Sequence, residues 1–283
     1  MRGSSQAKMA IILASALALG AVQARTALAD CKDLPGYDEL TDALDKAVAQ
    51  SNGGLENDMW ATIVDRDGIV CAVTFSGGDR GDQWPGSRVI SAQKANTANA
   101  FSLPKGAGGI DGLALSTANL WTAAQPGGST FVGIAPGGTL FGLQFSNPVA
   151  TDVAYKGPAT KFGKPNDPMV GKAIGGVNVF GGGLALYEAD GHLLGAVGVS
   201  GDTSCTDHNV AWRVRDTLAL DDVPNGIGTP GDNIAFDVTN TTNGNASSEG
   251  GFGHPQCDDN SATVNTAVVT ACPLNDGATD GCV

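Results

Sequence analysis

The sequence lacks the short motifs that identify most common enzyme and cofactor classes. No GxGxxG or GxxxxGK[ST] segment follows an expected strand, so a nucleotide site is not indicated. There is no GxSxG nucleophile elbow, no HExxH and no CxxC pair, and therefore no positive support for a serine hydrolase, a zinc protease or a structural zinc site. The chain has only three histidines, which are His192, His208 and His254.

Basic residues are also scarce. The chain has 16 lysines and arginines against 29 acids, which gives a formal net charge of −13. An acidic surface disfavours binding to nucleic acid or to anionic lipid. It favours solubility and, weakly, cationic partners.

The first 29 residues have the pattern of a secretory signal. Arg2 and Lys8 give the segment a positively charged start. Met9–Val22 is an apolar run that is too short for a membrane anchor, and Ala27–Ala29 provides a cleavage site of small residues. We therefore expect export to the periplasm or the extracellular space, with Asp30 as the first mature residue. No later segment is apolar enough to span a membrane.

All six cysteines follow the expected cleavage site. An even number in an exported chain indicates up to three disulfides, with 15 possible pairings. The last three lie in a Gly- and Asn-rich tail with little apolar material, so we expect at least one to tie the tail to an earlier cysteine. The six are Cys31, Cys71, Cys205, Cys257, Cys272 and Cys282.

Hydrophobic periodicity predicts an α+β fold, with an antiparallel sheet and helices packed on it. Asp190-Gly191 indicates a two-residue hairpin turn. The expected helices are 37–50, 87–102, 113–124 and 206–220, and the expected strands are 60–64, 69–75, 184–187 and 193–199. Weaker patterns suggest a short strand at 131–134 and brief pairing at 140–147, and the polar segment 151–176 is expected to be a long loop.

The most informative stretch runs from Phe180 to His208. Gly195 and Gly198 lie inside an apolar strand, where glycine usually marks a bulge or the close approach of a ligand or another backbone. The helix expected at 87–102 is rich in small residues, which let a neighbouring element or a flat ligand come close. We therefore expect a pocket between residues 91–101, the turn at 180–183 and the start of the helix at 206–220.

Four segments carry a family resemblance. They are Thr62–Gly68, Ser91–Ala98, Phe180–Gly183 and Asp190–Asp207, and Gly195–Gly201 followed by Asp207 is the most specific part. With these residues the chain resembles the GlcG/HbpS-type family, often labelled haem-degrading or haem-binding, over roughly residues 38–220. The resemblance implies a profilin-like sandwich, a homo-oligomer, and haem or another small molecule as ligand.

The resemblance also directs attention to particular side chains. Lys94 either is solvated or pairs with a carboxylate such as a haem propionate. Asp207 either caps the following helix or orients His208, which is either a surface residue or a haem or metal ligand. The predicted ligand-binding residues are Lys94, Phe180, Gly181, Gly182, Gly183, Asp207 and His208.

The remaining histidines are His254 and His192. His254 either supports a disulfide or reaches back from the tail as a second metal ligand beside His208. His192, next to the hairpin turn, is expected to be exposed. For Trp60, Trp121 and Trp212 we expect core packing.

The predicted organisation is a signal peptide at 1–29, a GlcG/HbpS-like domain at 30–220 and an acidic, disulfide-rich extension at 221–283. The first functional hypothesis is an exported haem- or small-ligand-binding protein. The second is an enzyme acting on a small organic acid or a tetrapyrrole, with Asp207 and His208 as acid and base. The third is a structural or assembly component in which the acidic tail makes the contacts.

Overall fold

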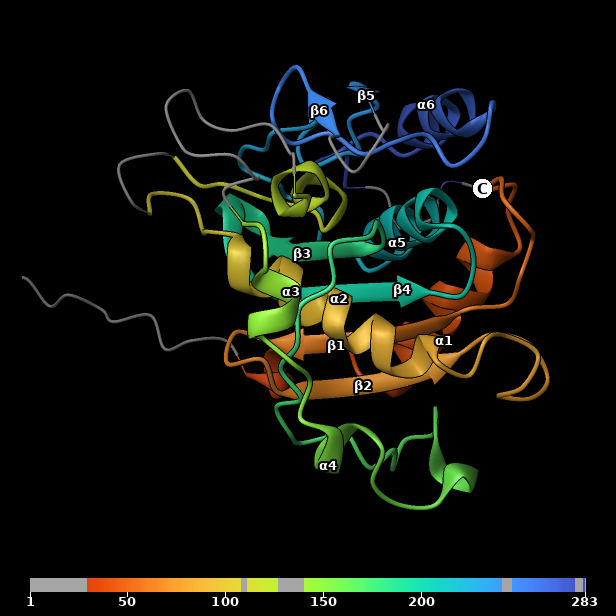
Figure 1. Ribbon diagram of the computed structural model, residues 1–283. Helices are drawn as coiled ribbons and strands as arrows, with labels where there is room; N and C mark the ends of the chain where they lie inside the picture. Colours follow the sequence, from red (N-terminus) through yellow and green to blue (C-terminus); the bar gives the residue numbers. More distant parts are fainter. Residues whose placement is uncertain (1–29, 108–110, 127–139, 241–245, 278–281, 283) are drawn as a thin grey trace, which may run out of the picture.

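The centre of the protein is a four-stranded antiparallel sheet (Figure 1). The computed structural model describes residues 30–107, 111–126, 140–240, 246–277 and 282. The strand order is β2-β1-β4-β3. The strands are β1 (Trp60–Asp65), β2 (Val70–Phe75), β3 (Gly183–Glu188) and β4 (His192–Ser200). The predicted α+β class is confirmed, and the expected signal segment lies outside the described residues.

The hairpin between β3 and β4 turns at the predicted Asp190-Gly191, but its loop has three residues where two were expected, because Glu188 pairs with His192 and Ala189–Gly191 forms a 3-10 turn. Asp190 and Gly191 both have positive φ, at 67° and 70°, a conformation that Asp and Gly adopt more readily than most residues. The turn between β1 and β2 is fixed by Asp65, whose Oδ1 accepts the backbone N–H groups of Asp67 and Ile69. Local sequence therefore determines both hairpins.

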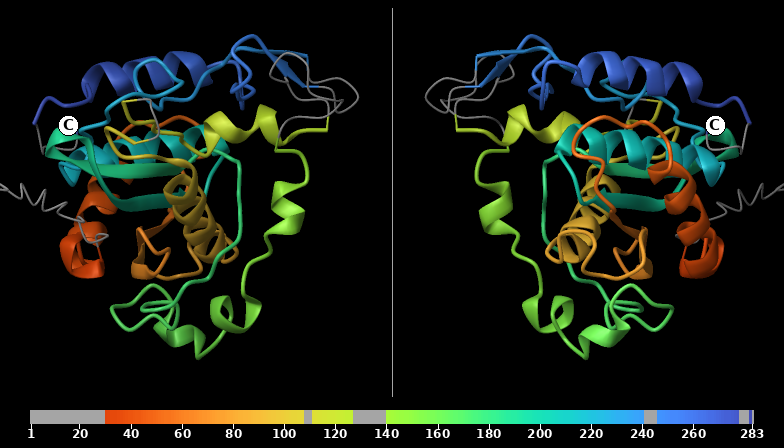
Figure 2. Two further views of the ribbon diagram at one scale, coloured as in Figure 1. Left: turned by 90° about the vertical axis from the view of Figure 1, so that its left-hand side faces the viewer. Right: turned by 90° about the vertical axis from the view of Figure 1, so that its right-hand side faces the viewer.

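Helices cover both faces of the sheet. α2 (Ser87–Phe101) packs on one face, and α1 (Tyr37–Val48) and α5 (Ser204–Thr217) pack on the other (Figures 1 and 2). Alternate residues of β1 face opposite layers, so Trp60 joins the α2 side and Ile63 the α5 side. Every residue of β1 is buried as a result.

The small residues of α2 allow its backbone to touch the sheet. A Cβ atom on Gly198 of β4 would lie 2.0 Å from the carbonyl oxygen of Ser91. One on Gly183 would lie 2.5 Å from the carbonyl oxygen of Lys94. Of the two readings of these small residues, the structure shows the approach of a neighbouring element.

A long insertion leaves the body of the protein before β3. It contains α3 (Leu143–Ser146) and α4 (Thr151–Ala154), and runs past the β2 edge of the sheet (Figure 2). A buried ion pair holds it: Arg88 of α2 donates from Nε to Asp167 Oδ2 at 2.8 Å and makes a second contact from Nη2 to Oδ1. The expected loop at 151–176 is therefore mostly irregular but anchored.

Two expected elements differ in the structure. The segment 113–124 forms two short 3-10 helices, Ala118–Leu120 and Thr122–Ala124, where one α-helix was expected. The expected pairing at 140–147 is replaced by α3, which follows Gly142 in the left-handed conformation at φ 87°. The strand expected at 131–134 lies outside the described residues.

The tail forms an outer layer over α5. It contains β5 (Val238–Asn240), β6 (Ser247–Ser248) and α6 (Ser261–Ala271), and α6 packs against α5 (Figure 2). Asp232 of the tail accepts two hydrogen bonds from Arg215 of α5, at 2.7 and 2.8 Å, and both side chains are fully buried. Because the tail covers it, α5 is buried from Cys205 to Asp216.

Three disulfides join the six cysteines. Cys31 pairs with Cys71, Cys205 with Cys257, and Cys272 with Cys282. The bond between Cys205 and Cys257 links α5 to the tail, which confirms the expected tie. Among the described residues, no helix is long and apolar enough to cross a membrane.

Candidate functional site

The structure brings most of the predicted ligand-binding residues together. Lys94 comes from α2, Gly181 and Gly182 from the turn before β3, and Asp207 and His208 from the first turns of α5. A Cβ atom on Gly182 would lie 2.9 Å from the Cβ of Asp207 and 3.1 Å from Lys94 Nζ. A Cβ atom on Gly181 would lie 3.1 Å from the Cβ of His208.

The space directly beside these glycines is filled by the protein's own atoms among the described residues, and the ligand-binding role of the site stays a prediction. Backbone atoms occupy the space: a Cβ on Gly181 would lie 2.3 Å from the carbonyl oxygen of Ser204, and one on Gly182 would lie 2.4 Å from that of Val199. Gly182 also has φ 113°, which other residues rarely adopt. These glycines permit close contact between segments of the protein itself.

Lys94 is buried and has an internal partner. Its Nζ lies 2.6 Å from Asp207 Oδ2 and donates to the carbonyl oxygen of Val199 at 3.0 Å. Asp207 Oδ1 accepts the backbone N–H groups of Gly201 and Asp202 at 3.0 and 2.9 Å. Burial raises the pKa of Asp207 to about 6 against the opposing effect of Lys94, and burial lowers the pKa of Lys94. The pair joins α2 to the start of α5.

His208 is completely buried under the tail. Its Nε2 accepts the backbone N–H of Ile234 at 3.2 Å and lies 3.2 Å from Asn233 Oδ1. Burial lowers the pKa of His208 to about 4, so the ring is neutral at neutral pH. The other ring nitrogen, Nδ1, has no hydrogen-bond partner among the described residues. The reading of His208 as a surface residue is wrong.

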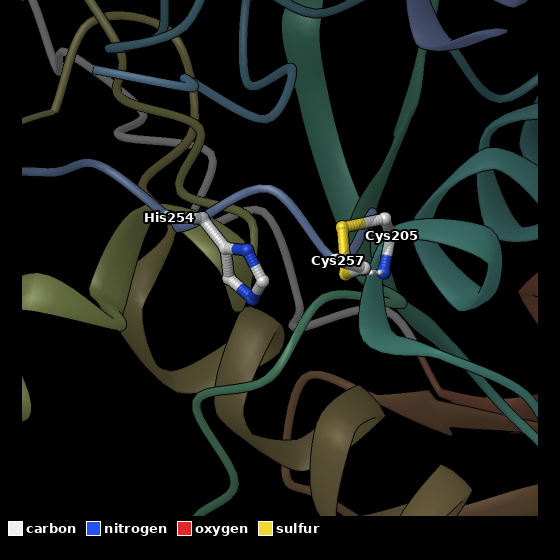
Figure 3. A group of neighbouring side chains, drawn as sticks. All are labelled: Cys205, His254 and Cys257. Carbon is white, nitrogen blue, oxygen red and sulfur yellow. Dashed lines mark hydrogen bonds between the residues drawn. A yellow bond between two sulfur atoms is a disulfide. The ribbon is translucent and has the colours of Figure 1, made fainter. Parts of the chain in front are cut away.

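His254 lies beside the disulfide that joins the tail to α5 (Figure 3). Its Nε2 lies 2.9 Å from Ser204 Oγ, and its Nδ1 donates to the carbonyl oxygen of Pro255 at 2.6 Å. One ring nitrogen of His254 and the sulfurs of Cys205 and Cys257 lie within 4.8 Å of one another. The two sulfurs are bonded to each other, so this group does not offer three free metal ligands.

The remaining predicted positions lie apart from these residues. Phe180 is half exposed and lies at the start of the glycine turn. His192 is partly exposed and contacts Glu188 through Nδ1 at 2.6 Å. Trp60 and Trp212 are buried as expected, whereas Trp121 is only partly buried and stacks at an angle on His254.

The sequence reading missed a pocket of about 340 Å³ on the other side of α5. The end of α1, the loop Gln50–Gly53, Glu56, Asn57 and the α5 residues Thr206 and Val210 line it. Asn52 fixes the loop, because its Oδ1 accepts from Arg213 Nε at 3.0 Å and its backbone oxygen accepts from Asn209. The signal in the sequence is Asn52-Gly53-Gly54, a turn-forming segment directly after the helix expected at 37–50.

The lining of this pocket is mainly polar. Glu56 is its only charged side chain, and it has the left-handed φ of 58° that is uncommon outside glycine. Neither His, Lys nor Arg is among its lining residues. The pocket can therefore offer backbone groups, amides, a hydroxyl and one carboxylate to a ligand.

The comparison with protein families gives one match. The family model described as "Haem degrading protein HbpS-like" matches residues 37–215, more than half of the chain. The chain belongs to the HbpS-like family. The match includes all four strands of the central sheet, the helices α1 and α2, and most of α5.

Solved structures similar to this member of the HbpS-like family include a PduOC:haem complex, with 22% identity, a TM-score of 0.39, and coverage of 63% of this chain and 88% of that one. The Klebsiella pneumoniae protein ORFY has 22% identity, a TM-score of 0.38, and coverage of 63% and 84%. HbpS has 17% identity, a TM-score of 0.30, and coverage of 64% and 85%. The comparison with curated proteins found no match.

Proposed function

We propose that this member of the HbpS-like family is an exported protein that binds a small molecule. Export is supported by the signal pattern of the first 29 residues and by six cysteines that form three disulfides, as is usual in oxidising compartments. Ligand binding is supported by the family description and by the pocket beside α5. From the family resemblance we also propose that the protein forms a homo-oligomer. Light scattering on the purified mature chain tests this.

The pocket beside α5 is the observation that carries this proposal. Its volume of about 340 Å³ lies at the small end of the range in which proteins bind organic ligands. Its carboxylate and amide groups suit a small polar molecule, either neutral or cationic. We therefore propose a ligand of that class at this place.

Haem at the predicted site does not fit the described arrangement. Haem needs an accessible axial ligand and space for a flat macrocycle, whereas His208 is fully buried and backbone atoms fill the glycine turn. Lys94, the residue expected to meet a propionate, already pairs with Asp207. Haem binding at His208 is the second candidate, and it requires the segment at Asn233–Ile234 to move so that Nε2 becomes free.

The enzyme hypothesis gains no support from the two residues assigned to it. Asp207 and His208 are both buried and bonded to other parts of the chain, so neither reaches a substrate in this arrangement. The assembly hypothesis assigned the tail to contacts with partners. In the structure, the tail packs on α5 of its own chain.

Ligand titrations of the mature protein test the proposal. A panel of small polar amines, amides and alcohols is screened by thermal shift, and each hit is measured by calorimetry. Ser51→Trp places a large side chain at the exposed rim of the pocket and is expected to weaken binding at least 10-fold. Ser146→Trp, an exposed change on α3, is the matched control and should bind as the parent protein does.

Haemin is titrated in the same way and followed by its absorption spectrum. A spectral shift that is lost in His208→Gln but kept in Ser51→Trp would place haem at the second candidate site. Failure of every panel member to bind, or equal binding by parent and Ser51→Trp, would refute the pocket as the ligand site.

A further inference from the structure

The first turn of α5 is joined to the tail by the disulfide between Cys205 and Cys257 (Figure 3). Cys205 is 3% exposed, whereas Cys257 belongs to a stretch at 256–260 that is open to solvent. Cys257 is therefore the more accessible of the two cysteines to a thiol in solution. This difference determines which sulfur would be attacked.

A backbone donor faces the accessible sulfur. The N–H of Cys205 donates to the Sγ of Cys257 at 3.1 Å, and this N–H belongs to the first turn of a 14-residue helix. Ser204 Oγ lies 3.6 Å from the same sulfur, while its hydroxyl hydrogen is donated to His254 Nε2. Donors and a helix N-terminus stabilise a thiolate and lower the pKa of a cysteine.

The other two disulfides lack the combination of exposure and a donor. Around Cys31 and Cys71 the near groups are acceptors only, with Asp65 Oδ2 3.7 Å from Cys31 Sγ and the carbonyl oxygen of Ile69 3.4 Å from Cys71 Sγ, and acceptors oppose negative charge on sulfur. Cys205 Sγ also has an acceptor, the carbonyl oxygen of Pro255 at 3.8 Å, so the difference lies in the N–H that faces Cys257.

Cys272 has a donor, Arg213 Nη1 at 3.8 Å, but Cys272 and Cys282 are 1% and 9% exposed, so a reductant has little access to them.

We propose that the Cys205–Cys257 bond is a thiol–disulfide exchange site, open to small thiols and dithiols. A reductant thiolate attacks Cys257 Sγ and forms a mixed disulfide there, and Cys205 leaves as a thiolate at the start of α5 and takes up a proton. A second reductant thiol then attacks the mixed disulfide on the reductant's sulfur and releases Cys257 as the stabilised thiolate. Two thiols are oxidised to one disulfide and two protein thiols are formed, so atoms and electrons balance.

Reduction of this disulfide breaks the covalent link between the tail and α5. The segment that carries His254 would keep its hydrogen bond to Ser204 and its backbone contacts, while the ion pair of Arg215 with Asp232 continues to hold the tail further along. The exchange is therefore local and does not require the protein to unfold. It goes beyond ligand binding and does not depend on it.

Stepwise reduction of the intact mature protein tests this inference. The protein is equilibrated with graded ratios of reduced to oxidised glutathione, quenched with acid and alkylated, and each cysteine is quantified by mass spectrometry. Cys205 and Cys257 should be labelled at a ratio at which Cys31, Cys71, Cys272 and Cys282 remain paired. Circular dichroism at that ratio should be unchanged.

The internal comparison of three disulfides needs no variant, because the two other bonds of the same molecule are the controls. Opening of Cys31–Cys71 first, or of all three bonds together with loss of structure, would overturn the proposal.

Discussion

His208 is a residue whose neutral form the fold requires. Its Nε2 must stay unprotonated to accept the N–H of Ile234, and the ring has no access to water. Asp232 favours the charged ring, while burial, Arg215 and His254 oppose it, and burial has the largest effect. The same cause lowers the pKa of His254 to about 4.

These two histidines make the free energy of unfolding depend on pH. In the unfolded chain a histidine binds a proton near pH 6.5, whereas the folded protein binds it only near pH 4. The unfolded state therefore binds more protons between these values, so stability is complete above pH 6.5 and falls as the pH falls toward 4. Each histidine accounts for a loss on the order of 3 kcal/mol at pH 4.

Urea unfolding of the parent protein and of His208→Gln at pH 7 and pH 4.5 checks this. The variant is expected to have a lower free energy of unfolding than the parent at pH 7. Its free energy of unfolding should also fall less than that of the parent between pH 7 and pH 4.5. Asp207, with its pKa raised to about 6, affects the pH dependence of stability with the opposite sign. Because Asp207 is present in both proteins, its effect cancels in the comparison. Equal losses in both proteins would show that His208 does not control the acid response.

The sequence predicted which of these residues meet, but not what lies between them. Gly181, Gly182, Asp207 and His208 follow one another along a hairpin and the helix after it, so their proximity is nearly local. The atoms that fill the space come from elsewhere, such as the N–H of Ile234 in the tail. No spacing within a single segment indicates such a contact, because it depends on how the tail folds back.

At the scale of elements, sequence reading succeeded where apolar periodicity was strong and failed where short polar side chains competed with the helix. The segment 113–124 has suitable apolar spacing, yet Asn119 Oδ1 accepts the N–H and the hydroxyl of Ser116, and Thr117 Oγ1 accepts the N–H of Gly183. Such side-chain bonds offer the backbone an alternative to the helix. Two short 3-10 turns result.

The contact between α2 and β4 gives a prediction for Gly198. Gly198→Ala would place a methyl group 2.0 Å from the carbonyl oxygen of Ser91 and 2.5 Å from the backbone nitrogen of Ala95, neither of which can move without shifting the helix. We expect a loss of about 3 kcal/mol, at the upper end of the usual cost of overpacking. Thermal and urea unfolding measure it.

Gly86 at the start of the same helix is the matched control. A Cβ there would meet nothing within 4 Å, and its φ of −65° suits any residue. Gly86→Ala should change stability by less than about 1 kcal/mol. A well-tolerated Gly198→Ala would mean that the helix does not touch the strand here and that the open space first expected from the sequence exists after all.

At the scale of the whole molecule, the tail contributes to the stability of the body. The sequence pattern presented residues 221–283 as an appendage with little apolar material. In the structure, Asp232 neutralises Arg215, and Asn265 of α6 donates to Asn209 of α5 at 2.9 Å. The tail is therefore held by polar contacts and one disulfide, which hydrophobic periodicity does not detect, together with a few apolar residues such as Val268 that join the core.

Asp232→Ala tests how far the body depends on the tail. The change leaves the fully buried Arg215 with the carbonyl oxygen of Ala185, at 3.2 Å, and the Trp212 ring, at 4.7 Å, in place of its carboxylate partner. Removing one partner of a buried ion pair costs about 3–5 kcal/mol, because the remaining charge stays out of water. The free energy of unfolding in urea, compared with that of the parent, measures the loss.

Asp42→Ala supplies the comparison, since it breaks an exposed pair with Lys46 at 2.7 Å, which contributes only about 0–1 kcal/mol. Arg215→Met combined with Asp232→Leu removes both buried charges and should recover most of the stability that Asp232→Ala loses. Limited proteolysis should cut Asp232→Ala within residues 221–260 before the parent. If Asp232→Ala lowered the free energy of unfolding no more than Asp42→Ala does, the packing of α5 would not depend on the tail. The extension would then be an appendage, as the sequence alone suggests.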